Sequence, residues 1–155
     1  MADRLEVGGP APGFVLADQT GSSVALAGFE GRRVLVYFYP KADTPGCTTQ
    51  ACGLRDILGD IGDTAVVGVS PDLPAKLAKF DAKHSLGFPL LSDPDHAVAE
   101  AYGVWVEKSM YGRKYMGMER ATYLIGADGR VVKAWRKVKV PGHAAEVLNA
   151  ARANP

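Results

Sequence analysis

Residues 33–58, RVLVYFYPKADTPGCTTQACGLRDIL, combine an apolar run, a turn and a helical pattern, and they carry both cysteines of the chain. Residues 34–39 are apolar or aromatic without alternation, which is typical of a central strand buried on both faces. Pro40 ends this strand, because proline has no N–H to donate to a neighbouring strand. The sequence therefore predicts a buried strand that leads directly into a cysteine-bearing turn.

A helix is predicted to follow the turn. Thr44 suits the N-cap and Pro45 suits the first helical position. The residues of one helical face then recur at spacings of three and four, at Cys47, Ala51, Leu54 and Leu58. We expect the helix to end near Gly59.

The rest of the chain alternates strands and helices. Further strands are expected at residues 14–16, 24–26, 64–69, 88–91, 121–125 and 130–135, and further helices at residues 73–84, 97–102 and 141–151. Residues 103–117 are expected to form an irregular excursion or a hairpin. This order predicts an α/β fold, with a mixed central sheet flanked by helices and an N-terminal β-hairpin, in a single domain over residues 1–155.

Composition and charge argue against several classes of function. The net charge of +1 and scattered basic residues argue against nucleic-acid binding. No apolar run approaches the roughly 18 residues of a membrane-spanning helix, and the first residues lack the apolar core of a signal peptide. We therefore expect a cytoplasmic protein with no membrane role. In a reducing compartment, two cysteines five residues apart indicate chemistry more than structure.

Cys47 is expected in the first turn of the predicted helix. Unpaired N–H groups and the positive end of the helix dipole favour a thiolate there. Gly46 leaves room for a small ligand to approach the backbone. The alternative is a buried cysteine that serves only as a small apolar side chain, but the turn around Cys47 favours the reactive interpretation.

The spacing of the two cysteines has a mechanical consequence. On a regular helix, residues 47 and 52 differ by about 500° of rotation and about 7.5 Å of rise, so their Cα atoms would be roughly 8.7 Å apart. A disulfide needs less than about 7 Å. If Cys47 and Cys52 bond to each other, the first turns of the helix must unwind. Packing of Cys52 against the sheet as an apolar side chain is the alternative.

Several motifs together resemble a known family. The segment PKADTPGC (residues 40–47) is similar to the peroxiredoxin active-site pattern of Pro, three residues, Thr or Ser, two residues and Cys. The longer string YFYPKADTPGCTTQACGLRD, with LLSDPDHAVAEAYGVW, YGRKYMG and RATYLI further along, resembles the bacterioferritin comigratory protein (PrxQ) subfamily. This resemblance extends over nearly the whole chain and implies a thioredoxin-like fold.

The resemblance also implies a set of roles. Cys47 would be the peroxidatic nucleophile, which attacks the peroxide O–O bond and becomes a sulfenic acid. Thr44 would contact the thiolate and peroxide oxygens through its hydroxyl, and Pro40 would shield the sulfur from water. Arg120 would hold the thiolate and the charge that develops on the leaving oxygen. The backbone N–H groups of Gly46 and Cys47 would position the peroxide.

The same resemblance implies how the cycle is completed. Cys52 would be the resolving cysteine, which attacks the sulfenic acid to form an intramolecular disulfide. Thioredoxin or a similar dithiol reductant would then reopen it. The implied enzyme is a monomeric thiol peroxidase for hydrogen peroxide and organic hydroperoxides, without cofactor or metal. A thioredoxin-like disulfide oxidoreductase is an alternative, although that chemistry usually uses C-x-x-C, and a non-catalytic peroxide sensor is another.

Other residues are expected to be structural. Gln50 stands where many relatives carry Glu, which weakens any argument for a carboxylate that tunes the loop. The histidines show no ligand spacing, and each is expected to be a surface or capping residue: His84, His96 and His143. Core or edge packing is the expected role of the aromatic and methionine side chains between residues 105 and 116, with covering of the site or reductant binding as alternatives.

Overall fold

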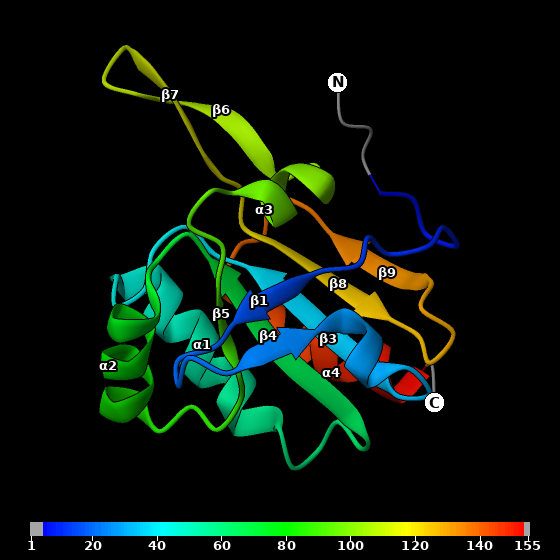
Figure 1. Ribbon diagram of the computed structural model, residues 1–155. Coiled ribbons are helices and arrows are strands. Elements are labelled where there is room, and N and C mark those ends of the chain that lie inside the picture. Colours follow the sequence, from blue (N-terminus) through cyan, green and yellow to red (C-terminus); the bar gives the residue numbers. More distant parts are fainter. Residues whose placement is uncertain (1–4, 154–155) are drawn as a thin grey trace.

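The structure is a computed structural model that describes residues 5–153. Its centre is a mixed sheet with the strand order β2-β1-β5-β4-β3-β8-β9 (Figure 1). These strands are β1 (Val15–Ala17), β2 (Ser23–Ala25), β3 (Arg33–Phe38), β4 (Thr64–Ser70), β5 (Leu90–Ser92), β8 (Ala121–Ile125) and β9 (Val131–Trp135). β3 pairs in parallel with β4 and antiparallel with β8. The predicted mixed sheet and the N-terminal β1–β2 hairpin are therefore confirmed.

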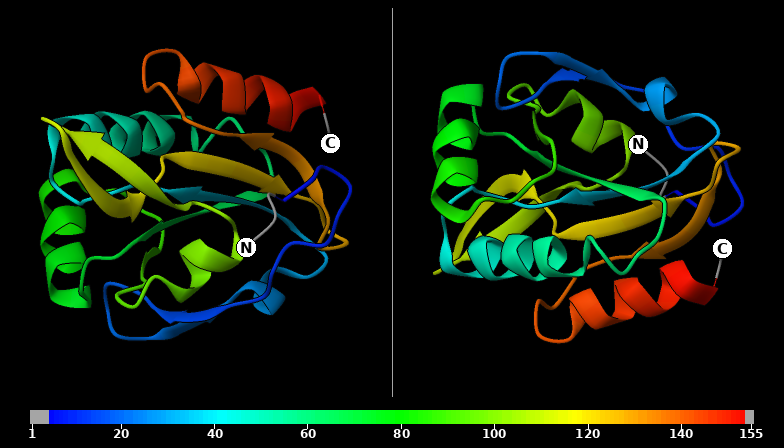
Figure 2. Two further views of the ribbon diagram at one scale, coloured as in Figure 1. Left: turned by 90° about the horizontal axis from the view of Figure 1, so that it is seen from above. Right: turned by 90° about the horizontal axis from the view of Figure 1, so that it is seen from below.

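Helices cover both faces of this sheet (Figure 2). The helices are η1 (Leu26–Phe29), α1 (Pro45–Ile57), α2 (Pro74–His84), α3 (Ala97–Ala101) and α4 (His143–Ala153). Side chains of α1, α2 and α4 pack into one apolar cluster, and α3 packs with the N-terminal segment into the other. Within residues 5–153, no helix combines the length and apolar character needed to span a bilayer.

Side chains of β3 contribute to both apolar clusters, as the unbroken apolar run of this strand predicts. Leu35 and Tyr37 point into the α1 side, whereas Val34 and Val36 point into the other, and all four are at most 1% exposed. The Tyr37 ring lies against the neighbouring strand at Gly68, where a Cβ atom would come within 2.9 Å of it. This close approach requires glycine in β4.

The register between β3 and β8 places Arg120 at the end of β3. Phe38 pairs with Ala121 in the antiparallel ladder, so the preceding residue, Arg120, lies just past the carboxyl end of β3. Its backbone carbonyl accepts a hydrogen bond of 2.9 Å from the Val138 N–H. The end of β3 and the start of β8, which are far apart in sequence, therefore meet where the chain turns into α1.

Residues 105–118 form a hairpin of β6 (Trp105–Met110) and β7 (Arg113–Met118), which is a separate two-stranded sheet. Figure 1 shows it standing away from the central sheet. Trp105 is partly buried and stacks on His96 at a centroid distance of 4.0 Å. The prediction of core or edge packing is wrong for the other large apolar side chains, which are exposed: Met110, Tyr111, Tyr115 and Met116.

His143 is also placed differently from its prediction as a surface or capping residue. It is the first residue of α4, it is 2% exposed, and its Nε2 lies 2.9 Å from the Thr122 hydroxyl of β8. The Trp135 ring meets it edge-on. Burial lowers the pKa of His143, and the Glu146 carboxylate, 3.7 Å from Nδ1, opposes this shift. His143 is thus a neutral core residue joining α4 to the sheet.

The stability of the protein should therefore fall in mild acid. The unfolded chain takes up a proton at His143 near the ordinary pKa of 6.5, whereas the folded chain resists protonation until lower pH. The free energy of unfolding should decline as pH drops below about 6.5. Urea titrations at a series of pH values should show a shallower decline for His143→Gln.

Glu146→Gln provides the matched control for this effect. Removing the opposing carboxylate should lower the pKa of His143 further and deepen the loss of stability in acid. If the free energies of unfolding of the wild type and His143→Gln depend on pH in the same way, His143 does not cause the loss of stability in acid.

Candidate active site

The loop between β3 and α1 is held by contacts to two other elements. Asp43 adopts a positive φ of 62°, which turns the chain toward α1 at some conformational cost. Its carboxylate pairs with Lys83 of α2 at 3.2 Å. The Ala42 N–H donates to Asp72 Oδ2, just beyond β4, at 2.7 Å. Sequence reasoning missed Asp72, whose role depends on the β3–β4 pairing.

Thr44 occupies the N-cap of α1, as predicted, but its side chain does not cap the helix. The hydroxyl instead donates to the Lys41 carbonyl at 2.8 Å. Within the described part of the chain, the N–H groups of Gly46 and Cys47 have no hydrogen-bond partner. The first turn of α1 therefore offers two free donors next to the Cys47 side chain.

Cys47 and Arg120 meet directly. The Cys47 side chain is 1% exposed, and its Sγ accepts a hydrogen bond from Arg120 Nη2 at 3.3 Å. A Cβ atom at Gly46 would lie 3.2 Å from the same Nη2, so glycine makes room for the guanidinium. The sulfur therefore has a permanently charged donor and two free N–H groups beside it, an arrangement that stabilises negative charge at this position.

Gln50 completes the support of Arg120. It lies three residues after Cys47, on the same face of α1, and is 3% exposed. Its Oε1 accepts a hydrogen bond of 2.6 Å from Arg120 Nη1, whereas its Nε2 has no partner in the described residues. Sequence reasoning missed this role, although the i, i+3 spacing from Cys47 could have indicated it. Because Gln50 is neutral, it orients the guanidinium without cancelling its charge.

Cys52 lies on the same unbroken helix as Cys47 and is partly buried against the α1 side of the core. Both cysteines are free thiols. The helix runs regularly through both positions, so the separation of roughly 8.7 Å expected from ideal geometry applies to this state. The alternative in which Cys52 packs as an apolar side chain describes this reduced fold well.

Two further ionisable groups, Lys108 and Tyr37, have pKa values that respond to the charges of the site. Burial, assisted by the positive charge of Arg120, lowers the pKa of Lys108 on β6, and the negative charge of Cys47 opposes this. Burial also raises the pKa of Tyr37 on β3, with smaller contributions from Tyr39 and Cys47. The hairpin base and the strand beneath α1 thus lie within electrostatic reach of the sulfur.

Pro40 is partly buried where β3 ends, and its shielding of the sulfur stays a prediction.

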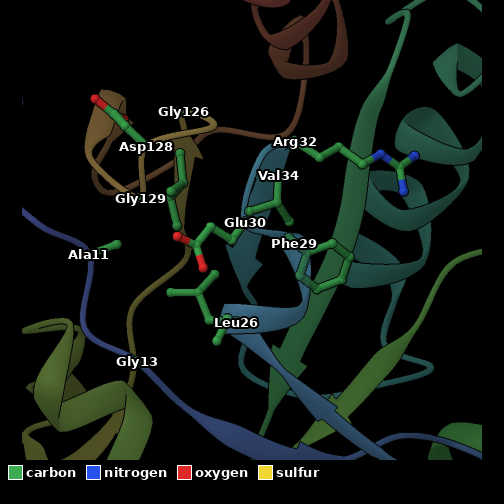
Figure 3. A pocket seen from close by; sticks show the side chains of 12 residues that line it. Ala11, Gly13, Leu26, Phe29, Glu30, Arg32, Val34, Gly126, Asp128 and Gly129 are labelled. Atoms are coloured by element: carbon green, nitrogen blue, oxygen red, sulfur yellow. The ribbon is translucent and has the colours of Figure 1, made fainter.

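A separate cavity of about 200 Å³ lies at the opposite end of β3, where Val34 and Ile125 line it (Figure 3). Glu30 points into this cavity, which neither cysteine lines. Among the described residues, no group of three or more His, Cys, Asp or Glu side chains could hold a metal ion. The contact described above is that of the Cys47 thiol beside the Arg120 guanidinium.

Comparison with known proteins assigns this chain to a family. The AhpC/TSA family model matches residues 7–134. Peroxiredoxin Bcp of Escherichia coli is 50% identical over 147 residues, which cover 94% of each chain. A mutant of Peroxiredoxin Q from Xanthomonas campestris has a similar structure, with a TM-score of 0.90, 41% identity, and coverage of 97% of this chain and 98% of the other.

A second Xanthomonas campestris structure, of bacterioferritin comigratory protein, matches with a TM-score of 0.88 and 40% identity over 96% of each chain. The chain belongs to the AhpC/TSA family and, within it, to the bacterioferritin comigratory protein (PrxQ) group of peroxiredoxins.

Proposed function

We propose that this thiol-dependent peroxidase reduces hydrogen peroxide and organic hydroperoxides at Cys47. The Cys47 thiolate attacks one peroxide oxygen to form a sulfenic acid, the O–O bond breaks, and the second oxygen leaves as water or an alcohol after taking up the proton that the thiol lost. The observation that carries this proposal is the 3.3 Å contact between Cys47 Sγ and Arg120. Alkyl peroxide reduction activity is described for the bacterioferritin comigratory protein of Xanthomonas campestris, which supports organic hydroperoxides as substrates here.

Arg120 and the free N–H groups are assigned to charge stabilisation. As the O–O bond breaks, negative charge moves from sulfur to the leaving oxygen, and a fixed guanidinium interacts with both atoms. The N–H groups of Gly46 and Cys47 would position the peroxide beside the sulfur. The Thr44 hydroxyl would have to turn from the Lys41 carbonyl to reach the peroxide oxygens. Pro40 would keep bulk water from the thiolate.

Cys52 is assigned to the second half of the cycle. Its thiol attacks the sulfur of the Cys47 sulfenic acid, water leaves, and an intramolecular disulfide forms. A dithiol such as thioredoxin then reduces this disulfide and is itself oxidised. Because both cysteines belong to one chain, the chemistry needs no second subunit, which supports a monomer formed by one domain over residues 1–155. The need for a dithiol reductant supports a cytoplasmic location.

Peroxide-dependent NADPH oxidation, coupled through thioredoxin and thioredoxin reductase, tests the cycle. Wild-type protein should turn over continuously, and Cys47→Ser should show no activity above background. Cys52→Ser should consume about one peroxide per chain and then stop, since its sulfenic acid has no partner. Unchanged turnover in Cys47→Ser would contradict the proposal, and sustained turnover in Cys52→Ser would show that an external thiol resolves the sulfenic acid.

Stopped-flow measurement of the first reaction with hydrogen peroxide tests the Arg120 arrangement. Arg120→Met should slow this step by roughly 100-fold or more, because a charge-stabilising donor is lost. Gln50→Leu should slow it by about tenfold, because the guanidinium loses the acceptor that orients it. Gln50→Glu, which keeps an acceptor oxygen, should retain more activity than Gln50→Leu.

Thr49→Ala is the matched control on α1. Thr49 is exposed, and its hydroxyl donates to the Pro45 carbonyl at 3.0 Å, so the variant should react at the wild-type rate. A Gln50→Leu variant as fast as Thr49→Ala would show that Gln50 does not position Arg120.

A further inference from the structure

The β6–β7 hairpin exposes large apolar side chains that no other part of the described chain covers. Tyr111, at its turn, is 99% exposed, Met110 is 56% exposed and Tyr115 is 44% exposed. The hairpin is paired only with itself, and a lone two-stranded hairpin is marginally stable in water. Grouped apolar side chains on a projecting element are typical of an interaction surface.

One face of this hairpin is turned toward the reactive sulfur. Cross-strand partners share a face, so Lys108 lies with Tyr115, and Met110 lies with Arg113. The Lys108 ammonium donates to the Met118 carbonyl, two residues before Arg120, and its pKa responds to the charges of Arg120 and Cys47. In the view from above, the hairpin projects over the end of the sheet where α1 begins (Figure 2).

The charges of the hairpin indicate which kind of partner matches its exposed face. Residues 105–118 carry three positive side chains and one negative one, which gives three minus one, or +2, against +1 for the whole chain. The positive side chains are Lys108, Arg113 and Lys114, and the negative one is Glu107. A second copy of the chain, docked symmetrically through this face, would place like charges opposite each other. A partner with an apolar surface and an acidic rim is the better match.

We propose that the hairpin face formed by Lys108, Met110, Arg113 and Tyr115, with Tyr111 at its tip, is the docking surface for the dithiol protein that reduces the enzyme. This inference rests on the proposed function. The partner would have an apolar surface beside its own two cysteines and acidic residues around it. Methionine side chains suit such a surface, because they adapt to different partners.

A partner docked on this hairpin face would lie next to α1. A partner thiolate attacks one sulfur of the Cys47–Cys52 disulfide, forming a mixed disulfide and releasing the other sulfur as a thiolate. The second partner thiol then displaces the remaining enzyme sulfur. The partner leaves as a disulfide, and the enzyme regains both thiols, so two electrons and two protons are transferred. The encounter is brief, as is common for redox partners with small interfaces.

Comparing two reductants tests the docking surface. Tyr111→Ser and Met110→Gln change exposed side chains. With thioredoxin and its reductase as the probe, each variant should raise the KM for thioredoxin, by roughly tenfold in the double variant, with little change in kcat. With dithiothreitol, which needs no docking surface, turnover should match the wild type. The stopped-flow rate with hydrogen peroxide should also be unchanged.

Val15→Ser is the matched control, because Val15 is 67% exposed on β1, away from the hairpin in the described fold. It should leave the KM for thioredoxin unchanged. Raising the salt concentration should raise this KM in the wild type but not affect turnover with dithiothreitol.

Three results would overturn the inference. One is an equal loss of activity with both reductants, which would place the hairpin in the catalytic machinery. Another is an unchanged KM for thioredoxin in the double variant. The third is a wild-type dimer in analytical ultracentrifugation that dissociates on Tyr111→Ser. Failure of the wild type to reduce peroxide with dithiothreitol would instead refute the proposed function, and the docking surface with it.

Discussion

The contact between the Cys47 sulfur and the Arg120 guanidinium joins two segments that are far apart in sequence. It depends on the register of β3 with β8, which brings Arg120 to the end of β3, and on the glycine at position 46, which leaves space for Nη2. Gln50 fixes the other arm of the guanidinium. Three elements must therefore be in place before the sulfur has its charged neighbour, and the reactive state is a property of the assembled fold.

The same helix that builds this contact keeps the two cysteines apart. α1 is continuous through residues 47 and 52, and helix geometry separates their Cα atoms by roughly 8.7 Å, beyond the range of a disulfide. In the proposed cycle, the intact helix serves the peroxide reaction and a locally unwound helix serves resolution. The loop before α1 is suited to such a change, because a strained Asp43 and a few polar contacts hold it.

Local sequence patterns predicted much of the fold and part of the site. Three signals each depend on only a few neighbouring residues and could therefore be recognised in the sequence. They are the unbroken apolar run of β3, the Thr-Pro start of α1 and the turn signals of the hairpins. Gln50, Asp72 and the buried His143 could not, because their roles depend on partners that only the tertiary fold brings close. The exposure of Tyr111 and Tyr115 was missed for a related reason. Aromatic residues usually pack into a core, and only the topology shows that the outer part of the hairpin has no core beneath it.

Hydrogen exchange of the α1 amides, compared between reduced protein and protein treated with one equivalent of peroxide, most directly tests whether the helix opens. The amides of residues 47–52 should lose protection when the Cys47–Cys52 disulfide forms, whereas the amides of β3 and α4 should keep theirs. Mass spectrometry of the same samples would verify that the disulfide is present. Equal protection of residues 47–52 in the two states, with the disulfide formed, would contradict an unwinding step.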